Sequence, residues 1–207
     1  MGKLGYKNIL IDFDDTIVDF YDAEEWAFHY WEAFQQNKLT KSEVLSERFV
    51  NYFKHHQMEV DGHRADVLFR NGLAEAKVKY FDQTLETIVE LSKRHDLYIV
   101  TNGVTETQKR RLNQTPLHKY IKKIFISEET GYQKPNPEFF NYVFNDIGED
   151  ERQHSIIVGD SLTSDILGGI NAGIATCWFN FRGFDHNPGI IPDYEINSWK
   201  QLNDIVR

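Results

Sequence analysis

The sequence lacks the residues that disulfide-linked or membrane-bound proteins need. Of its 207 residues only one, Cys177, is a cysteine, so an intramolecular disulfide is excluded. Cys177 lies in a short apolar run, and we expect it to be a packing residue. No run reaches transmembrane length, and the amino-terminal residues 1–6 lack a signal-peptide stretch. We therefore expect a cytoplasmic protein without a membrane partner.

The chain also lacks the basic excess that a nucleic-acid duplex requires. It has 23 Lys and Arg against 32 Asp and Glu, a formal net charge of −9. Duplexes are bound through basic side chains that displace counterions, so we expect no such partner. A small anionic substrate remains compatible with this charge, because a bound cation can reverse the local field.

Five short apolar runs predict a parallel β-sheet. None alternates with polar residues, which is typical of strands that helices bury on both faces. The runs are residues 9–11, 97–100, 124–126, 156–158 and 175–179.

Helix signals separate the last four runs. Thr105 and Gln108 have the spacing of a capping box at the start of one helix. Asn136, followed by Pro137, fits the N-cap of a second, and Gly173 fits the end of a third. Strands alternating with helices predict an α/β fold, a doubly wound and mostly parallel Rossmann-like sheet.

The segment between the first two runs is too long for one crossover. Its residue pattern predicts helices only, so we predict an inserted all-helical cap at residues 18–80. The Rossmann-like core is then formed by residues 1–17 and 81–207.

The cap holds much of the 14% aromatic content. Most of these rings should form the cap's own core. The first cap helix, with Trp26, Tyr30 and Trp31, follows Asp12 and Asp14 most closely in sequence. We therefore expect it to reach a ligand bound by these carboxylates more readily than the second helix does.

Four polar signatures follow predicted strands, at the edge where parallel α/β sheets bind ligands. The first is Asp12-Phe13-Asp14-Asp15-Thr16. Residues i and i+2 of an extended segment point to the same side, so Asp12 and Asp14 can face one ligand. Their repulsion calls for a cation or a shared proton. The alternative is an acidic turn that caps a helix.

The second and third signatures suit an anion. Thr101, Asn102 and Gly103 offer a hydroxyl, an amide and close backbone approach before a helix N-terminus, which favours phosphate binding. Lys134 precedes Pro135, which should hold it extended and aimed at an anionic group.

The fourth signature supplies further carboxylates. Asp160 follows a predicted strand, and Asp165 lies in the first turn of the next helix. Oxygen ligands from Asp12, Asp14 and Asp160 would form a hard site that favours Mg²⁺, and no His/Cys grouping competes with it.

In this order, Asp-x-Asp-x-Thr, a strand-end Thr, Lys-Pro and Gly-Asp-x-x-x-x-Asp resemble the four motifs of haloacid dehalogenase superfamily hydrolases. The insert resembles that superfamily's helical cap of the first type. More narrowly, residues 12–20, 98–104, 131–135 and 165–173 resemble the pyrimidine 5'-nucleotidase branch, which hydrolyses nucleoside monophosphates. One departure is Asp15, where many superfamily members carry glycine.

The resemblance implies a role for each motif residue. Asp12 would attack phosphorus and form an aspartyl phosphate. Asp14 would protonate the leaving alcohol and then take a proton from water. Thr101 and Lys134 would act on the phosphate oxygens, with Asn102 and Gly103 in the same substrate-binding loop.

The resemblance also implies a Mg²⁺ site. Its ligands would be Asp12, the backbone carbonyl of Asp14, and Asp160. Asp165 would be either a further ligand or a partner of Lys134 or of the metal's waters.

A carboxylate at Asp14 favours an alcohol leaving group, because dehalogenating relatives lack an acid there. The expected partner is a small-molecule phosphomonoester, most specifically a pyrimidine nucleoside monophosphate, non-standard ones included. A sugar-phosphate phosphatase or a phosphomutase of the same superfamily remains open.

More distant alternatives are a phosphorylated signalling receiver and a silent scaffold. Receivers carry the acceptor Asp after the third strand, where this chain has Ser127 and Glu128. We expect a monomer or a small homo-oligomer.

Overall fold

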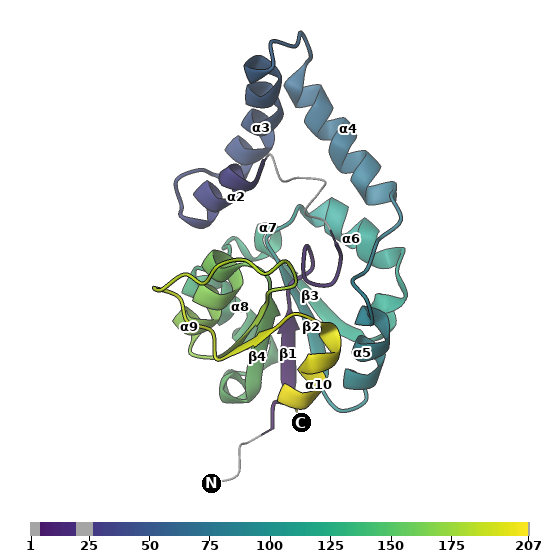
Figure 1. Ribbon diagram of the computed structural model, residues 1–207, viewed down its shortest axis with the longest axis vertical. Coiled ribbons are helices and arrows are strands. Elements are labelled where there is room, and N and C mark those ends of the chain that lie inside the picture. The colour runs from purple at the N-terminus through teal and green to yellow at the C-terminus, as the bar shows by residue number, and fades with distance from the viewer. Residues whose placement is uncertain (1–4, 20–26, 207) are drawn as a thin grey trace.

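The computed structural model describes residues 5–19 and 27–206, which form a core around a parallel sheet and a helical cap above it (Figure 1). Six strands lie in the order β3-β2-β1-β4-β5-β6, and every pair is parallel. The predicted doubly wound α/β class is confirmed. The strands are β1 (Asn8–Ile11), β2 (Asp96–Thr101), β3 (Ile121–Ile126), β4 (Ser155–Gly159), β5 (Ala175–Phe179) and β6 (Tyr194–Ile196).

Both faces of the sheet are buried, as the continuous apolar runs predicted. On β1, Ile9 and Ile11 join one core cluster while Leu10 joins the other, because alternate strand residues face opposite sides. Helices α5 (Thr84–Leu91), α6 (Thr105–Asn113) and α10 (Leu202–Ile205) cover the first cluster. Helices α8 (Pro137–Ile147) and α9 (Leu167–Ala172) cover the second.

The sixth strand, β6, was not predicted. It has three residues, and only Ile196 is fully buried, so its Tyr-Glu-Ile sequence gives no continuous apolar run. Cys177, on the neighbouring β5, has no exposed surface, which confirms its expected packing role. Burial raises the pKa of its thiol to about 12.

The predicted helix signals are partly right. Helix α6 begins at Thr105 itself with Val104 as N-cap, so the proposed capping box is wrong. The Gln108 side chain bonds to Asp14 and Thr101 instead. Asn136 is the N-cap of α8, but its side chain makes no capping bond and approaches Asn37 of the cap. Helix α9 ends before Gly173 as expected, and a π-helical turn (Leu162–Ile166) precedes it.

Shorter elements complete the core. They are 3₁₀ turns at Pro116–Lys119, Glu149–His154 and Trp199–Gln201, and the short helix α7 (Ser127–Thr130). None of the helices in the described residues is both long and apolar enough to cross a membrane.

The described part of the cap contains α2 (Phe28–Gln35), α3 (Lys41–His55) and α4 (Gly62–Glu75), above the carboxyl ends of the strands (Figure 1). A buried ion pair, Arg48 Nη2 to Asp66 Oδ1 at 2.7 Å, joins α3 to α4. Beside it, the rings of Phe49 and Phe69 lie 5.4 Å apart. These rings form the cap's own core, as expected.

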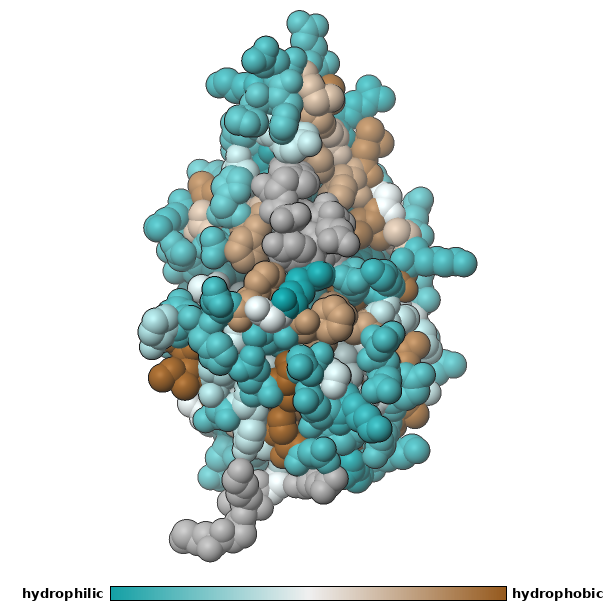
Figure 2. Space-filling model, in the orientation of Figure 1, coloured by the Kyte–Doolittle hydropathy of each residue, from teal (hydrophilic) through white to brown (hydrophobic). Residues whose placement is uncertain are grey.

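Val18 and Tyr80 form an antiparallel bridge where the chain leaves the core for the cap and returns. Hydrophilic residues cover most of the face of the core shown in Figure 2. The apolar area on the cap lies over α4, where Val67 and Leu68 are exposed.

Candidate active site

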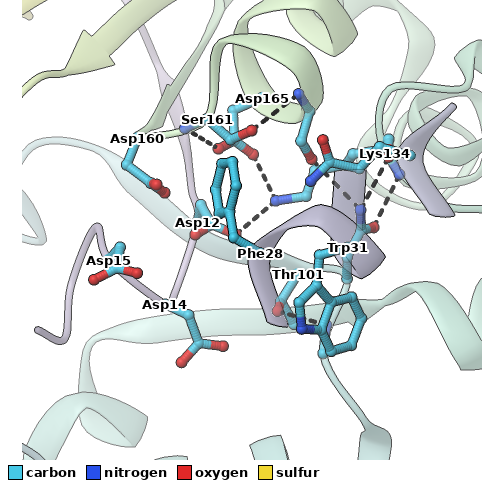
Figure 3. A pocket seen from close by; sticks show the side chains of 14 residues that line it. Asp12, Asp14, Asp15, Phe28, Trp31, Thr101, Lys134, Asp160, Ser161 and Asp165 are labelled. Atoms are coloured by element: carbon cyan, nitrogen blue, oxygen red, sulfur yellow. Dashed lines mark hydrogen bonds and ion pairs between the residues drawn. The ribbon is translucent and has the colours of Figure 1, made fainter. Parts of the chain in front are cut away.

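The four polar signatures meet at the carboxyl edge of the sheet (Figure 3). Asp12 follows β1, Thr101 ends β2, Asp160 follows β4, and Lys134 comes from the loop before α8. Together they line a cavity of about 150 Å³, which α2 of the cap closes on one side. Parallel strands bring their carboxyl ends to one edge, which is why residues so far apart in sequence lie together.

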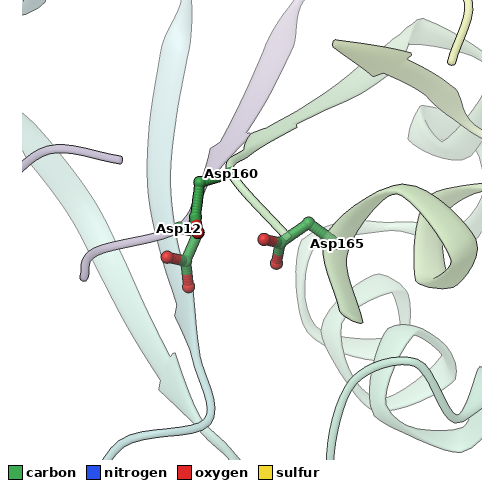
Figure 4. Close-up of side chains that lie close together, drawn as sticks. All are labelled: Asp12, Asp160 and Asp165. Carbon is green, nitrogen blue, oxygen red and sulfur yellow. The ribbon is translucent and has the colours of Figure 1, made fainter. Parts of the chain in front are cut away.

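Three carboxylates form the centre of the site. Oxygens of Asp12, Asp160 and Asp165 lie within 4.8 Å of one another (Figure 4). Fully ionised they carry three negative charges, and Lys134 supplies one positive charge, which leaves a net charge of −2. Burial raises the pKa of Asp12 to about 8 and that of Asp160 well above its usual range. A divalent cation would bring the net charge of the fully ionised cluster to zero.

Lys134 is the buried counter-ion of this cluster. Its Nζ donates to Asp12 Oδ1 at 2.6 Å, to Asp165 Oδ1 at 2.6 Å and to the Val100 carbonyl at 2.8 Å. Burial by itself lowers the pKa of Lys134, but the two carboxylates outweigh it and the pKa is raised. All three N–H donors are thus in use, so a direct contact with phosphate requires one of these bonds to exchange.

Asp165 is held close under β4. Its Oδ2 accepts from the Ser161 amide at 3.1 Å. A Cβ atom at Gly159 would lie 2.3 Å from the Asp165 carboxyl carbon, so only glycine allows this approach. Asp160 is fixed from the other side, because its amide donates to Thr16 Oγ1 at 3.0 Å.

The Thr101 hydroxyl is oriented as a donor. Its oxygen accepts from the Gly103 amide at 3.1 Å and from Gln108 Nε2 at 2.9 Å. Since both lone pairs are engaged, the O–H proton is left for an acceptor in the cavity. Thr101 is therefore suited to donate to a phosphate oxygen.

Asn102 and Gly103 serve this loop in different ways. The Asn102 amide makes a reciprocal pair with the Lys134 backbone, Nδ2 to O at 2.9 Å and N to Oδ1 at 3.0 Å. Asn102 thus also holds Lys134. A Cβ at Gly103 would lie 2.4 Å from Gln108 Nε2, so the glycine makes room for this side chain.

The Asp14 carboxylate is separate from the three-carboxylate cluster. In Figure 3 it points away from Asp160. Gln108 Nε2 donates to its Oδ2 at 2.7 Å, and Arg111 Nη1 donates to its Oδ1 at 2.5 Å. The Asp14 side chain therefore pairs with α6 and is not one of the three carboxylates of the cluster.

Asp15 adopts a left-handed backbone, with φ of +59°. Glycine is the relaxed residue in this region, and aspartate tolerates it better than most other side chains. The departure from glycine is accompanied by an ion pair, because Arg182 Nη2 lies 3.4 Å from Asp15 Oδ1 and 2.6 Å from Asp19 Oδ1.

Helix α2 forms the aromatic wall of the cavity. Phe28, Trp31 and Gln35 fall on one stripe of the helix and all line the cavity. Figure 3 shows Phe28 and Trp31 beside the carboxylates. Phe28 is 52% exposed. Trp31 is supported from behind, with the Phe34 ring at 6.1 Å and the Arg48 guanidinium at 5.8 Å from its own ring.

The expectation that the first cap helix approaches the site is met by Trp31 but not by Tyr30. Tyr30 lines a separate cavity between α2 and α3. Trp26 lies outside the described residues. Sequence reasoning missed Phe28 and Gln35 as lining residues, and it missed Gln108 and Arg111 behind Asp14. The stripe spacing 28-31-35 was the one signal that could have found the first two.

The cap contacts the core through polar bonds around the cavity. Lys41 Nζ at the start of α3 donates to the Gly103 carbonyl at 2.9 Å and to Ser127 Oγ at 2.6 Å. Thr163 Oγ1 donates to Gln35 Oε1 at 2.7 Å. These hydrogen bonds join α2 and α3 of the cap to loops of the core beside the cavity.

A parallel sheet with an acidic site at its carboxyl edge and a helical cap defines a capped α/β hydrolase. A family model described as haloacid dehalogenase-like hydrolase matches residues 9–179, and the chain belongs to this family. The predictions of this family and of an enzyme of the phosphatase class are confirmed.

Named relatives match nearly the whole chain. The HAD-hydrolase YfnB of Bacillus subtilis is 39% identical, covering 97% of this chain and 95% of its own. Its magnesium-bound crystal structure has a TM-score of 0.89, covering 98% of this chain and 99% of that one. Pyrimidine 5'-nucleotidases PynA of Streptococcus pneumoniae (32% identical; 97% and 95% covered) and YjjG of Escherichia coli (30%; 98% and 89%) are also similar.

Proposed function

We propose that the protein is a Mg²⁺-dependent phosphatase that hydrolyses pyrimidine nucleoside monophosphates through an aspartyl phosphate. The observation that carries this proposal is the buried cluster of carboxylates with Lys134 at its centre, facing a cavity walled by Trp31 and Phe28. The cluster supports the chemistry, and the aromatic wall supports the substrate class.

The reaction needs two displacements at phosphorus. Asp12 attacks, so that a bond from its carboxylate oxygen to phosphorus forms while the bond from phosphorus to the alcohol oxygen breaks. Asp14 gives its proton to the departing oxygen, and the nucleoside leaves. Water then attacks the same phosphorus and gives a proton to Asp14. Asp12 is released as a carboxylate, together with inorganic phosphate.

The remaining residues hold the phosphoryl group. Thr101 presents its O–H to a phosphate oxygen, because its own oxygen is already engaged by the Gly103 amide and Gln108. Lys134 stabilises the charge on Asp12 and Asp165, and through them the phosphoryl site. Charge stabilisation by such fixed groups is the main contribution to phosphoryl transfer.

A divalent cation fits the residues present. The donors of the cluster are oxygens only, three carboxylates lie together, and their charge exceeds that of Lys134 by two. Asp12, Asp160 and the Asp14 carbonyl would hold Mg²⁺, with Asp165 either as a ligand or through Lys134. When bound, Mg²⁺ would neutralise charge on the transferring phosphoryl group.

The cap supports a nucleotide over a sugar phosphate. A nucleobase offers a flat face to Trp31 or Phe28, and stacking of this kind is worth about 1–3 kcal/mol per base. A sugar phosphate offers no such face. The two named nucleotidases among the relatives support the same choice. We also propose that the cap opens to admit substrate, since its bonds to the core are polar.

The test is kcat/KM for dUMP, dTMP, UMP, glucose 6-phosphate and phosphoglycolate with Mg²⁺. Nucleotides should exceed the other two by about tenfold to a hundredfold, at 1.4 kcal/mol per factor of ten. Trp31→Leu should remove much of this preference. Tyr30→Leu, one residue away and facing another cavity, is the matched control and should keep it.

A higher kcat/KM for glucose 6-phosphate or phosphoglycolate would replace the nucleotidase proposal by a phosphatase that acts on non-nucleotide phosphomonoesters. The mechanism would still stand. A thermal melt of each variant checks that Trp31→Leu still folds.

A further inference from the structure

Two buried polar side chains on α6, Gln108 and Arg111, are not explained by the roles above. Gln108 is 2% exposed and Arg111 is 4% exposed. Buried arginine and glutamine are uncommon unless they are paired, so their partners indicate what they do. We call these two residues the α6 clamp.

The clamp holds both oxygens of the Asp14 carboxylate. Arg111 Nη1 reaches Oδ1 at 2.5 Å, and Gln108 Nε2 reaches Oδ2 at 2.7 Å. Arg111 Nη1 also donates to Gln108 Oε1 at 3.1 Å, which fixes the amide so that its NH₂ faces Asp14. The Arg111 guanidinium lies 5.0 Å from the Phe13 ring, which limits its movement. With both oxygens held, the carboxylate has one orientation toward the cavity.

Gln108 also links Asp14 to the phosphate-binding loop. Its second N–H donates to Thr101 Oγ1 at 2.9 Å. The space for Gln108 exists because residue 103 is glycine, whose Cβ would otherwise lie 2.4 Å from Nε2. One side chain therefore sets the distance between Asp14 and the hydroxyl aimed at the phosphate.

We propose that Gln108 and Arg111 are positioning residues that fix Asp14 for proton transfer to the leaving oxygen. This inference rests on the proposed function, in which Asp14 is the acid. Proton transfer depends steeply on geometry, because the donor must lie within hydrogen-bond distance of the leaving oxygen. A clamp that only filled space in the core would affect stability and leave the dependence on leaving group unchanged.

The leaving group provides the test. Phenyl phosphate and 4-nitrophenyl phosphate have nearly the same shape, but nitrophenolate leaves without a proton and phenolate leaves more readily with one. Neither contains a nucleobase, so the result does not depend on base recognition. Single-turnover rates with enzyme in excess and Mg²⁺ present isolate the first displacement.

Arg111→Met should lower the single-turnover rate with phenyl phosphate by at least about tenfold, and with 4-nitrophenyl phosphate by less than about threefold, since general acids contribute about 10²–10⁴-fold. Arg111→Lys should recover part of the loss. Gln108→Leu should lower both rates, because Thr101 is released as well, but phenyl phosphate more. Lys109→Met, on an exposed position of the same helix, should match the wild type.

Equal losses with the two substrates, or no loss, would overturn the proposal. If Arg111→Met does not fold, the same ratio measured for Arg111→Lys and Gln108→Leu decides. Asp14→Asn is the reference variant. If it shows the selective loss and the clamp variants do not, only the clamp is refuted. If Asp14→Asn shows no selectivity, the assignment of Asp14 as the acid fails, and the clamp's role with it.

Discussion

Asp160→Asn is the substitution that tests the charge balance of the site most directly. The asparagine keeps the shape of the side chain and an oxygen to accept the Thr16 hydroxyl, which lies 3.2 Å from Asp160 Oδ1. It removes one ionisable carboxyl from a cluster whose net charge is −2 when it is fully ionised. We therefore expect the variant to be more stable than the wild type without metal, and less stable than the wild type with Mg²⁺.

The magnitude follows from the spacing. Two unit charges 4.8 Å apart repel by about 3.5 kcal/mol at an effective dielectric constant of about 20. Asp160 meets two such charges, and Lys134 offsets one of them. The wild type relieves part of the remaining repulsion by keeping a proton on the cluster. We therefore expect the free energy of unfolding of the metal-free variant to be higher by about 1–2 kcal/mol, or roughly 2–8 °C in Tm.

Mg²⁺ should reverse the order of the two Tm values. Mg²⁺ at about 100 times its Kd stabilises a folded protein by about 2.7 kcal/mol, which for this size is about 5–11 °C. The wild type should show this rise, and Asp160→Asn should show less than about 2 °C. Asp150→Asn removes the same charge from an exposed position and should respond as the wild type does.

The pH dependence gives a second readout in EDTA. The folded pKa values of Asp12 and Asp160 are raised, so between the unfolded pKa near 4 and the folded value, about 8 for Asp12, unfolding releases protons. Stability should therefore fall as pH rises through this range and level off above it. Asp160→Asn should show a shallower fall. A lower metal-free Tm in the variant, or a full response to Mg²⁺, would refute the reasoning.

Two further predictions concern single residues. Asp12→Asn should leave the fold intact and reduce phosphate release below about a hundredth of wild type; higher retained turnover in a steady-state assay would contradict the covalent mechanism. Cys177 has no exposed surface and a pKa raised to about 12, so it should not react with a thiol reagent at pH 8 until the protein unfolds. Rapid labelling of the folded protein would contradict its packing role.

The sheet could be predicted because its strands are buried on both faces. Burial of this kind leaves a continuous apolar run, as in residues 156–158. The edge strand β6 carries no such signature. The place of Asp12 and Asp160 followed from the same reasoning, because a residue just after a parallel strand must lie at the ligand-binding edge.

The α6 clamp could not be predicted. Arg110 and Arg111 are neighbours in a polar helix, yet Arg110 reaches Glu75 at the surface while Arg111 is buried against Asp14. Local sequence does not distinguish them, since the difference arises from what packs on each side of α6. The same holds for Gln108, where the capping-box spacing suggested a local partner and the tertiary fold supplied a distant one.

The carboxylates at the sheet edge and the aromatic wall of the cavity belong to different parts of the fold. Asp12, Thr101 and Asp160 lie on the ends of strands in the rigid sheet, whereas Trp31 and Phe28 belong to the cap. In the proposed function, in which the cap opens to admit substrate, Trp31 and Phe28 contact the base while the cap is closed over the reacting groups. Binding energy from the base would then favour closure, which would expel water from the cluster before Asp12 attacks. A substrate without a base would lose this contribution at the chemical step as well as in binding, so the preference for nucleotides should appear in kcat and not in KM alone.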